Sequence, residues 1–254
     1  ARVMNKKYAF TIAEVLITLG IIGIVAAMTI PVIFSNISSA QYRSKFKKAV
    51  STLNQAGLMA QSQYDFNFAG TATKCLTNIE TASTEHPDSI MSFCAILNGT
   101  LASAAYYGPL TNLRRHTRDD KIVEYKLETK DTIPNNYTTY LTYTLADGMI
   151  VAFHPDAVHS ELPIGSRLTQ AFIDGTGPAL DLSTCVGFVD VNGVSLPNRE
   201  VTCSAGENKI GSNDHCVVKN NAGHMTDVFP IVFHDATVEP ASAAAAYVLD
   251  TSKL

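Results

Sequence analysis

The sequence lacks the short motifs that mark the common classes of enzyme. It has no G-x-S-x-G nucleophile elbow, no phosphate-binding P-loop and no H-E-x-x-H metal motif. It also lacks a C-x-x-C pair and an internal repeat, so its five cysteines do not indicate redox catalysis and would form disulfides if the chain is exported. The formal net charge of −4 argues against a nucleic-acid-binding surface.

The seven histidines are scattered and form no catalytic constellation. The densest group is HPDAVHSE at 154–161, with His154, Asp156, His159 and Glu161. We interpret this group as a solvated loop. The sequence therefore predicts that the protein is not an enzyme.

An apolar run covers residues 10–34 and contains a single charge, Glu14. At about 1.5 Å per residue, it is long enough to cross a hydrocarbon core of about 30 Å. Arg2, Lys6 and Lys7 precede it, which predicts a cytoplasmic N-terminus and an exported remainder. A charge at the centre of a membrane helix costs roughly 2.5–3.5 kcal/mol, so Glu14 needs a partner. A plain signal anchor is the alternative, and it offers none.

The stretch FTIAEVLITLGIIGIVAAMTIP closely resembles the class III signal and N-terminal helix of type IV pilins and pseudopilins. The resemblance implies that prepilin peptidase cleaves between Ala9 and Phe10 and that Phe10 is then N-methylated. Glu14 falls at the family's glutamate position, and Pro31 at its helix-kinking proline. Ala9 departs from the glycine that the family usually has before the cleavage point.

The resemblance also implies how the helix is used in a filament. The Glu14 carboxylate would lie near the N-terminal ammonium of a neighbouring subunit's Phe10, where opposite charge offsets desolvation. Gly23 and Pro31 both weaken a helix, so the segment between them is expected to become extended in the filament.

Four segments follow from this interpretation: a leader at 1–9, an assembly helix at 10–34, an amphipathic continuation at 35–65 and an extracytoplasmic domain at 66–254. Apolar residues at three- and four-residue steps over 40–61 predict the continuation, which is expected to end by Gly70. Two interpretations of its basic residues stay open: contact with lipid headgroups or acidic filament neighbours, and a solvated face. These residues are Arg43, Lys45, Lys47 and Lys48.

The rest of the chain predicts strands. Alternation over 122–128 indicates a half-buried strand, and 140–153 reads as a hairpin with Asp147 and Gly148 at its turn. Residues 185–193 form a further strand, and 228–233 an edge strand because of Pro230. The expected fold class is α+β, with a long N-terminal helix packed on an antiparallel sheet, as in the pilin-like family.

Residues 190–198 and 227–240 resemble the C-terminal region of bacterial prepilin-like proteins, with an insertion at 199–226. Major pseudopilins bind calcium in this region, which implies calcium as a possible cofactor here. The alternative is that the same residues only stabilise a turn, since EF-hand spacing is absent. The candidate ligands are Asp190, Asn192, Asn198 and Asp227.

The cysteines favour local disulfides, although sequence leaves other pairings open. Cys203 and Cys216 form the first expected pair, and Cys75 and Cys94 the second. Cys185 is left over as a small core residue. A zinc site with His215 and His224 is the weaker alternative, since the ligand spacing is absent.

The predicted function is a structural subunit of a type IV pilus or pseudopilus. Its expected partners are other pilin subunits, prepilin peptidase, the inner-membrane assembly platform and membrane lipid. It would reside in the bacterial inner membrane and then in an extracytoplasmic filament. Two alternatives are a membrane-anchored extracellular binding module and an exported enzyme on a pilin-like anchor.

Overall fold

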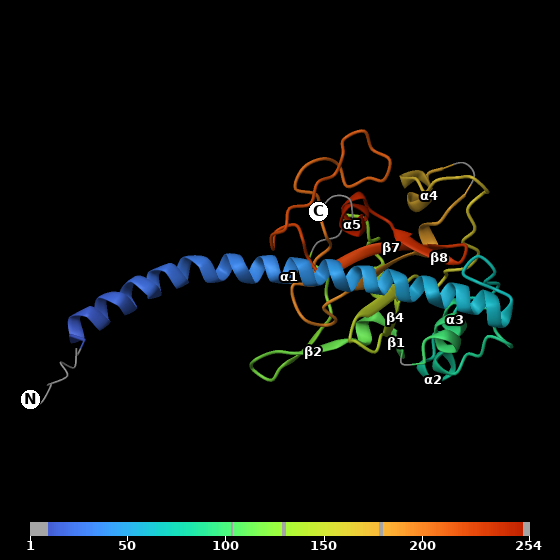
Figure 1. The fold of residues 1–254 in the computed structure, drawn as a ribbon. Coiled ribbons are helices and arrows are strands. Elements are labelled where there is room, and N and C mark those ends of the chain that lie inside the picture. Colours follow the sequence, from blue (N-terminus) through green and yellow to red (C-terminus); the bar gives the residue numbers. More distant parts are fainter. Residues whose placement is uncertain (1–9, 103, 129–130, 178–179, 251–254) are drawn as a thin grey trace, which may run out of the picture.

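One long helix, α1 (Ile12–Tyr64), links the apolar N-terminal segment to the globular domain (Figure 1). The computed structural model describes residues 10–102, 104–128, 131–177 and 180–250, with residues 31–37 described by their backbone alone. The leader at 1–9, and Ala9 with it, lies outside the described residues. The backbone of α1 continues as helix through position 31, and Figure 1 shows a gentle curve in its N-terminal half.

The remaining helices are short, and the strands form two sheets. The other helices are α2 (Ile79–Ser83), α3 (Phe93–Thr100), α4 (Gln170–Asp174), α5 (Ala243–Leu249) and the 3-10 turns η1 (Leu110–Asn112), η2 (Tyr137–Thr139) and η3 (Ser183–Cys185). The strands are β1 (Ala105–Pro109), β2 (Arg114–His116), β3 (Ile122–Glu124), β4 (Leu141–Thr144), β5 (Ile150–Phe153), β6 (Val186–Asp190), β7 (Val228–His234) and β8 (Thr237–Pro240).

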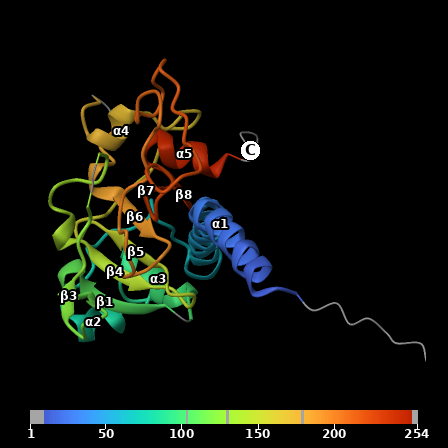
Figure 2. The ribbon, with the colours of Figure 1, turned by 90° about the vertical axis from the view of Figure 1, so that its left-hand side faces the viewer.

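The main sheet has six antiparallel strands in the order β1-β4-β5-β6-β7-β8, while β2 and β3 pair with each other in a separate two-stranded sheet. Strands β4 to β8 follow one another as a meander, and α1 lies along the sheet (Figure 2). Gly148 adopts a left-handed conformation (φ 82°) in the turn between β4 and β5, as the Asp-Gly pair predicts. The predicted α+β architecture is confirmed.

The α1 helix ends at Tyr64, before Gly70 is reached. Asp65 takes a left-handed conformation (φ 62°) that stops the helix. The Asn67 side chain then accepts hydrogen bonds from the amides of Ala69 and Gly70 at 2.9 and 3.2 Å. This turn redirects the chain before the glycine is reached.

The predicted edge position of residues 228–233 is wrong, because β7 pairs with β6 on one side and β8 on the other. The carbonyl of Pro230 accepts from the Ala241 amide at 2.9 Å, just beyond the last β8 residue, Pro240. A strand residue's N–H and C=O point to the same side, so the missing N–H faces the end of the β8 ladder. Proline therefore removes no hydrogen bond between paired strands.

The alternation over 122–128 predicts the burial of the side chains correctly, but the strand is shorter than predicted. Tyr125 and Leu127 are buried, whereas Lys126 and Glu128 are exposed. The strand ends at Glu124, and the Tyr125 amide turns to the Leu113 carbonyl at 3.2 Å.

Both faces of the sheet are covered. On the α1 face, Phe46 stacks on Phe229 with ring centroids 4.2 Å apart. Phe233 meets the rings of Phe93 and Phe68 on the same face, at 5.2 and 5.0 Å. The opposite face packs beneath the segment between β1 and β4, with these residues at its centre: Tyr125, Tyr140, Ile150 and Phe188.

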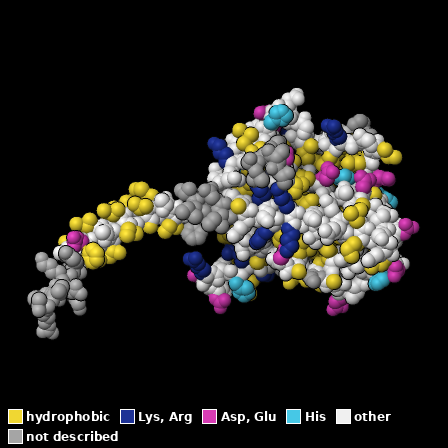
Figure 3. All heavy atoms as spheres, in the orientation of Figure 1, with side chains coloured by type: hydrophobic (Ala, Val, Ile, Leu, Met, Phe, Trp, Pro, Cys, Tyr) yellow, Lys and Arg dark blue, Asp and Glu magenta, His cyan; other side chains and the backbone are white. Residues whose placement is uncertain are grey.

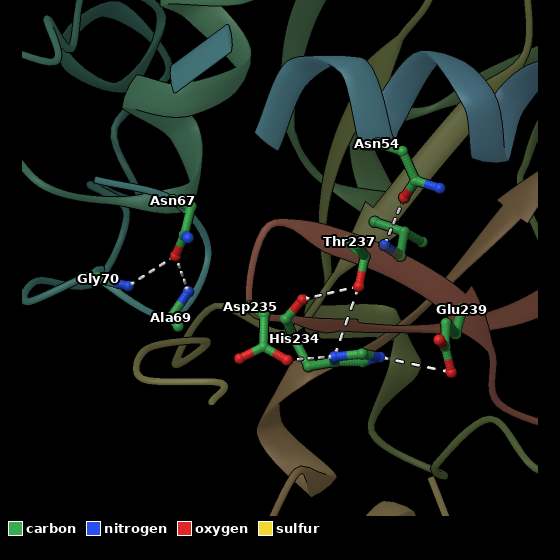
Figure 4. A network of polar contacts seen from close by, with 9 residues as sticks. Asn54, Asn67, Ala69, Gly70, His234, Asp235, Thr237 and Glu239 are labelled. Carbon is green, nitrogen blue, oxygen red and sulfur yellow. Dashed lines mark hydrogen bonds and ion pairs between the residues drawn. The ribbon is translucent and has the colours of Figure 1, made fainter. Parts of the chain in front are cut away.

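The turn between β7 and β8 is fixed directly to α1 (Figure 4). The Asn54 side chain accepts from the Val238 amide at 2.6 Å. A Cβ at Gly57 would lie 2.4 Å from the Ala236 carbonyl oxygen, so only glycine permits this approach. At the same turn, His234 lies between the carboxylates of Asp235 and Glu239, at 2.9 and 3.5 Å.

Candidate functional site

The start of α1 gives Glu14 a partner within its own chain. Thr11 is the N-cap, and its hydroxyl accepts from the Glu14 amide at 3.2 Å. The Glu14 carboxylate in turn accepts from the Thr11 amide at 2.9 Å and from the Thr11 hydroxyl at 2.8 Å. This reciprocal arrangement is a capping box. The expectation that a single anchored chain offers Glu14 no partner is therefore wrong.

The segment that follows presents apolar side chains all round. Ile12–Ile30 is, among the described residues, the one helical stretch long and apolar enough to cross a membrane. None of it packs against the domain, from which it projects (Figure 3). Leu16, Ile22 and Met28 are more than half exposed. A helix that is apolar on every side needs a membrane or other apolar helices around it.

The basic residues of α1 do not act as one solvated group. Arg43 is buried, with 8% of its surface exposed, so it lies on the packed face of the helix. Lys45 donates to the Val191 carbonyl at 3.2 Å, and Lys48 pairs with Asp147 at 2.8 Å. Part of this charge therefore docks the helix onto the loops at the ends of the strands.

The four calcium candidates come together beside α1. Both Asp190 and Asp227 are fully buried, and each carboxylate oxygen already accepts a hydrogen bond. Asp227 holds the backbone amides of Asn198 and Arg199 at 3.0 and 2.9 Å. Asp190 holds the Asn192 amide at 2.9 Å and the Tyr125 hydroxyl at 2.7 Å.

These hydrogen bonds satisfy both carboxylates and stabilise the turn after β6. Burial raises the pKa of Asp190 well above its usual value, and burial also raises the pKa of Asp227. Charge of the paired carboxylate adds to the shift at Asp190. Calcium binding by Asp190, Asn192, Asn198 and Asp227 stays a prediction of the sequence.

Glu200 is a buried carboxylate that the sequence does not single out. It accepts from the backbone amides of Asp131 and Thr132 at 2.7 and 3.0 Å. No cation pairs with it among the described residues, and burial raises its pKa from 4.5 to about 7. It thus ties the segment before β4 to the start of the insertion.

Replacing Glu200 with glutamine should remove a pH dependence of stability. The folded state keeps a proton on Glu200 between pH 4.5 and about 7, whereas the unfolded state has lost it. The free energy of unfolding therefore falls as the pH rises through this window, by roughly 3 kcal/mol at about 1.4 kcal/mol per pKa unit. Urea unfolding at a series of pH values measures this slope.

The matched control is Glu161→Gln, which changes an exposed carboxylate. It should leave the slope unchanged. An equal slope in wild-type protein and Glu200→Gln would contradict the assignment.

Disulfides are present at both local pairs named from the sequence. Cys75 and Cys94 are joined with Cα atoms 5.6 Å apart, and Cys203 and Cys216 with Cα atoms 5.4 Å apart. Cys185 is free and buried beside the start of β6, and burial raises its pKa to about 11, so it is a poor nucleophile.

The disulfides use the sulfurs that a metal would need. Glu85 lies beside Cys75 and Cys94, but its carboxylate accepts from the Leu76 amide at 2.6 Å and from the Ser92 hydroxyl. In the part of the chain that the structure describes, His215 and His224 do not join Cys203 and Cys216 in a ligand cluster.

The insertion is held by more than its disulfide. Asn208 accepts from the Ala244 amide at the start of α5 at 2.9 Å, and the Ile210 amide donates to Gln170 of α4 at 3.0 Å. Most of the side chains between Cys203 and Cys216 are exposed, so the segment is an ordered surface excursion.

The loop at 154–161 is ordered but has no catalytic geometry. His154 contacts the Asn136 side chain at 3.1 Å, and Asp156 pairs with Lys74 at 2.7 Å. Burial lowers the pKa of His154. These contacts attach the loop to neighbouring segments.

Comparison with known proteins gives one match, at the N-terminus. Residues 4–30 match the prokaryotic N-terminal methylation motif, which is typical of type IV pilins and pseudopilins. No curated protein and no solved structure matches the chain. The motif covers the capping box and the apolar segment of α1, so the resemblance inferred from the sequence is confirmed there.

Proposed function

Because residues 4–30 carry a motif of proteins that prepilin peptidase processes, we propose that the chain is a structural subunit of a type IV pilus or pseudopilus. The motif and the apolar helix indicate a membrane-anchored, extracytoplasmic protein of the cell envelope. The observation that carries the proposal is the bare apolar surface of Ile12–Ile30, which none of the described domain covers. In a filament, neighbouring copies of the same segment would surround it.

The proposed sequence of events involves the residues before α1 and the N-terminal part of that helix. Prepilin peptidase removes residues 1–9, and Phe10 becomes the N-methylated first residue. The assembly platform in the inner membrane then passes the subunit into the filament, and apolar contacts replace lipid around Ile12–Ile30. In this scheme a bound calcium ion would stabilise the structure and would have no catalytic role.

The alternatives are a tethered binding module and an exported enzyme. Pilin-like proteins are usually not enzymes, which weighs against the exported enzyme. A binding module would keep the anchor in the membrane and would not enter a filament. Locating the subunit in sheared surface filaments separates this alternative from the proposed function.

Processing provides the direct test. We expect the mature N-terminus to be a methylated Phe10, because the basic leader and the FTIAE segment resemble a prepilin processing site and lie within the matched motif. Mass spectrometry of the N-terminal peptide measures both the cleavage and the added methyl group. Glycine is usual before the cut, so Ala9→Gly serves as the comparison and should be cleaved at least as fast. Assembled subunits that keep residues 1–9 would contradict the proposal.

A further inference from the structure

The loop between β5 and α4 holds a fully exposed isoleucine on a well-defined turn. Ile164 is the most exposed of the large hydrophobic residues that the structure describes. The Ser166 amide donates to the Pro163 carbonyl at 2.9 Å, and Gly165 adopts a left-handed conformation (φ 80°). These are the features of a type II turn, which presents Ile164 at its second position. We call residues 163–166 the knob.

The knob is held in place on both sides. Leu162 and Leu168 flank it in sequence, and both pack against the hydrophobic core. A single exposed apolar residue is ordinary on a protein surface. Here the turn and its flanking leucines fix the side chain before any contact is made, so covering it costs little conformational entropy.

A hollow of about 530 Å³ lies beside the first packed turns of α1. Its walls include the apolar surfaces of Tyr42, Leu196 and Ala222, and Leu196 is 53% exposed at the rim. The two charged residues that line it are paired with each other, since Arg199 donates to Glu128 at 3.0 Å. The surface left for a partner is therefore mainly apolar, which suits an aliphatic side chain better than an ion.

The hollow and the knob lie at opposite ends of the domain. Tyr42 marks the level of the hollow on α1, whereas Gly57 contacts Ala236 in the turn after β7. Asp235 of that turn donates its amide to the Ser160 carbonyl at 2.7 Å, close to the knob in the sequence. Since α1 rises about 22 Å between Tyr42 and Gly57, the knob can reach a hollow only on another copy of the chain.

The charges of the two ends are complementary. On the face in Figure 3, Lys and Arg lie mainly toward the end from which α1 projects, and Asp and Glu mainly over the far end. The β2–β3 segment 114–126, at the near end in Figure 1, carries five Lys and Arg residues against three carboxylates. Exposed carboxylates of the far end include Asp65, Glu161 and Glu239, with Arg167 as a cation among them. Opposite net charge favours a head-to-tail approach of two copies.

We propose that the knob of one subunit inserts Ile164 into the hollow of the next copy along the filament. Each chain has a knob at one end and a hollow at the other, so the contact repeats without closing into a ring. Apolar burial holds the two domains together, and the charges of their ends orient them. This inference rests on the proposed function and adds to it the surfaces through which the domains stack.

A disulfide between subunits tests the contact directly. A chain with both Ile164→Cys and Ala222→Cys is oxidised in whole cell envelopes and analysed on a non-reducing gel. We expect a ladder of dimers, trimers and longer species, because every chain offers one cysteine at each end. Either substitution alone should give monomers. The matched control combines Ala222→Cys with Ser83→Cys, since Ser83 is exposed on α2, which packs beside β1 at the other edge of the sheet from β8.

Three results would overturn the inference. They are no ladder from the double variant, an equal ladder from the control, and dimers from Ile164→Cys alone, which would indicate that two knobs face each other. Filaments of wild-type protein without a ladder would contradict the contact and leave the assembly function standing. A ladder in envelopes that hold no filaments would contradict the assembly function and leave the contact standing.

Ile164→Ser should lower the amount of subunit in sheared filaments by about tenfold or more, because it removes an isoleucine side chain from the proposed contact. Folding should be unaffected, since the side chain contacts solvent in the single chain. Ile79→Ser is the matched control, because Ile79 is a partly exposed isoleucine of α2 that belongs to neither the knob nor the hollow. Wild-type assembly of Ile164→Ser would also overturn the inference.

Discussion

Glu14→Gln is expected to abolish filament assembly while leaving the subunit folded, inserted and processed. Glutamine keeps an oxygen that accepts the Thr11 amide, so the capping box seen at the start of α1 can persist. It removes the negative charge that we propose to pair with the Phe10 ammonium of a neighbouring subunit. Breaking one buried ion pair costs roughly 3–5 kcal/mol, so assembly should fall by about a hundredfold to several thousandfold. The readout is the amount of subunit in sheared filaments relative to the membrane pool.

Glu14→Ala separates the charge from the cap, because alanine removes both. If the charge drives assembly, the two variants should fail to the same degree. Normal assembly of Glu14→Gln together with failure of Glu14→Ala would show that the capping box is what matters. The proposed pairing between subunits would then be wrong.

Phe233→Ala should destabilise the globular domain more than other single truncations on the sheet. The ring is fully buried and meets the rings of Phe68, Phe93 and Phe153, with centroids 5.0, 5.2 and 6.3 Å away. Removing a buried phenyl group costs about 3–5 kcal/mol, a large share of the 5–15 kcal/mol that keeps a typical domain folded. Urea unfolding of the full chain in detergent measures the loss.

Tyr107→Ala is the matched control, since Tyr107 is an aromatic residue of β1 with 45% of its surface exposed. Its truncation should cost much less than that of Phe233. Equal losses would mean that the four-ring cluster does not dominate the core.

The long helix was predictable because its signals are local. Length, apolarity and three- and four-residue steps are all visible in the sequence before Tyr64. The order of the strands depends instead on pairing between distant segments, which is why Pro230 misleads. Whether Pro230 interrupts a strand pair depends on where β8 ends, and no residue near position 230 indicates that end.

The residues of the candidate site also divide into those with a local sequence signal and those without one. Phe10, Glu14 and Pro31 are recognisable because they lie at set spacings in one segment, although the cap between Thr11 and Glu14 was missed. An S/T-x-x-E pattern before an apolar run could have revealed it. Glu200 gains its importance only from burial against the segment before β4, which no local pattern encodes.

The continuity of α1 has a geometric consequence for the whole molecule. A helix of 53 residues spans about 80 Å, and no flexible linker separates its membrane part from its packed part. The rotation of the domain about the helix axis, and its distance from the membrane segment, are therefore fixed by the helix. Deleting one residue near position 35 would turn the domain by about 100° and draw it in by about 1.5 Å, without altering a single contact inside either part. A tethered module would tolerate that rotation, whereas a helical lattice of subunits would not.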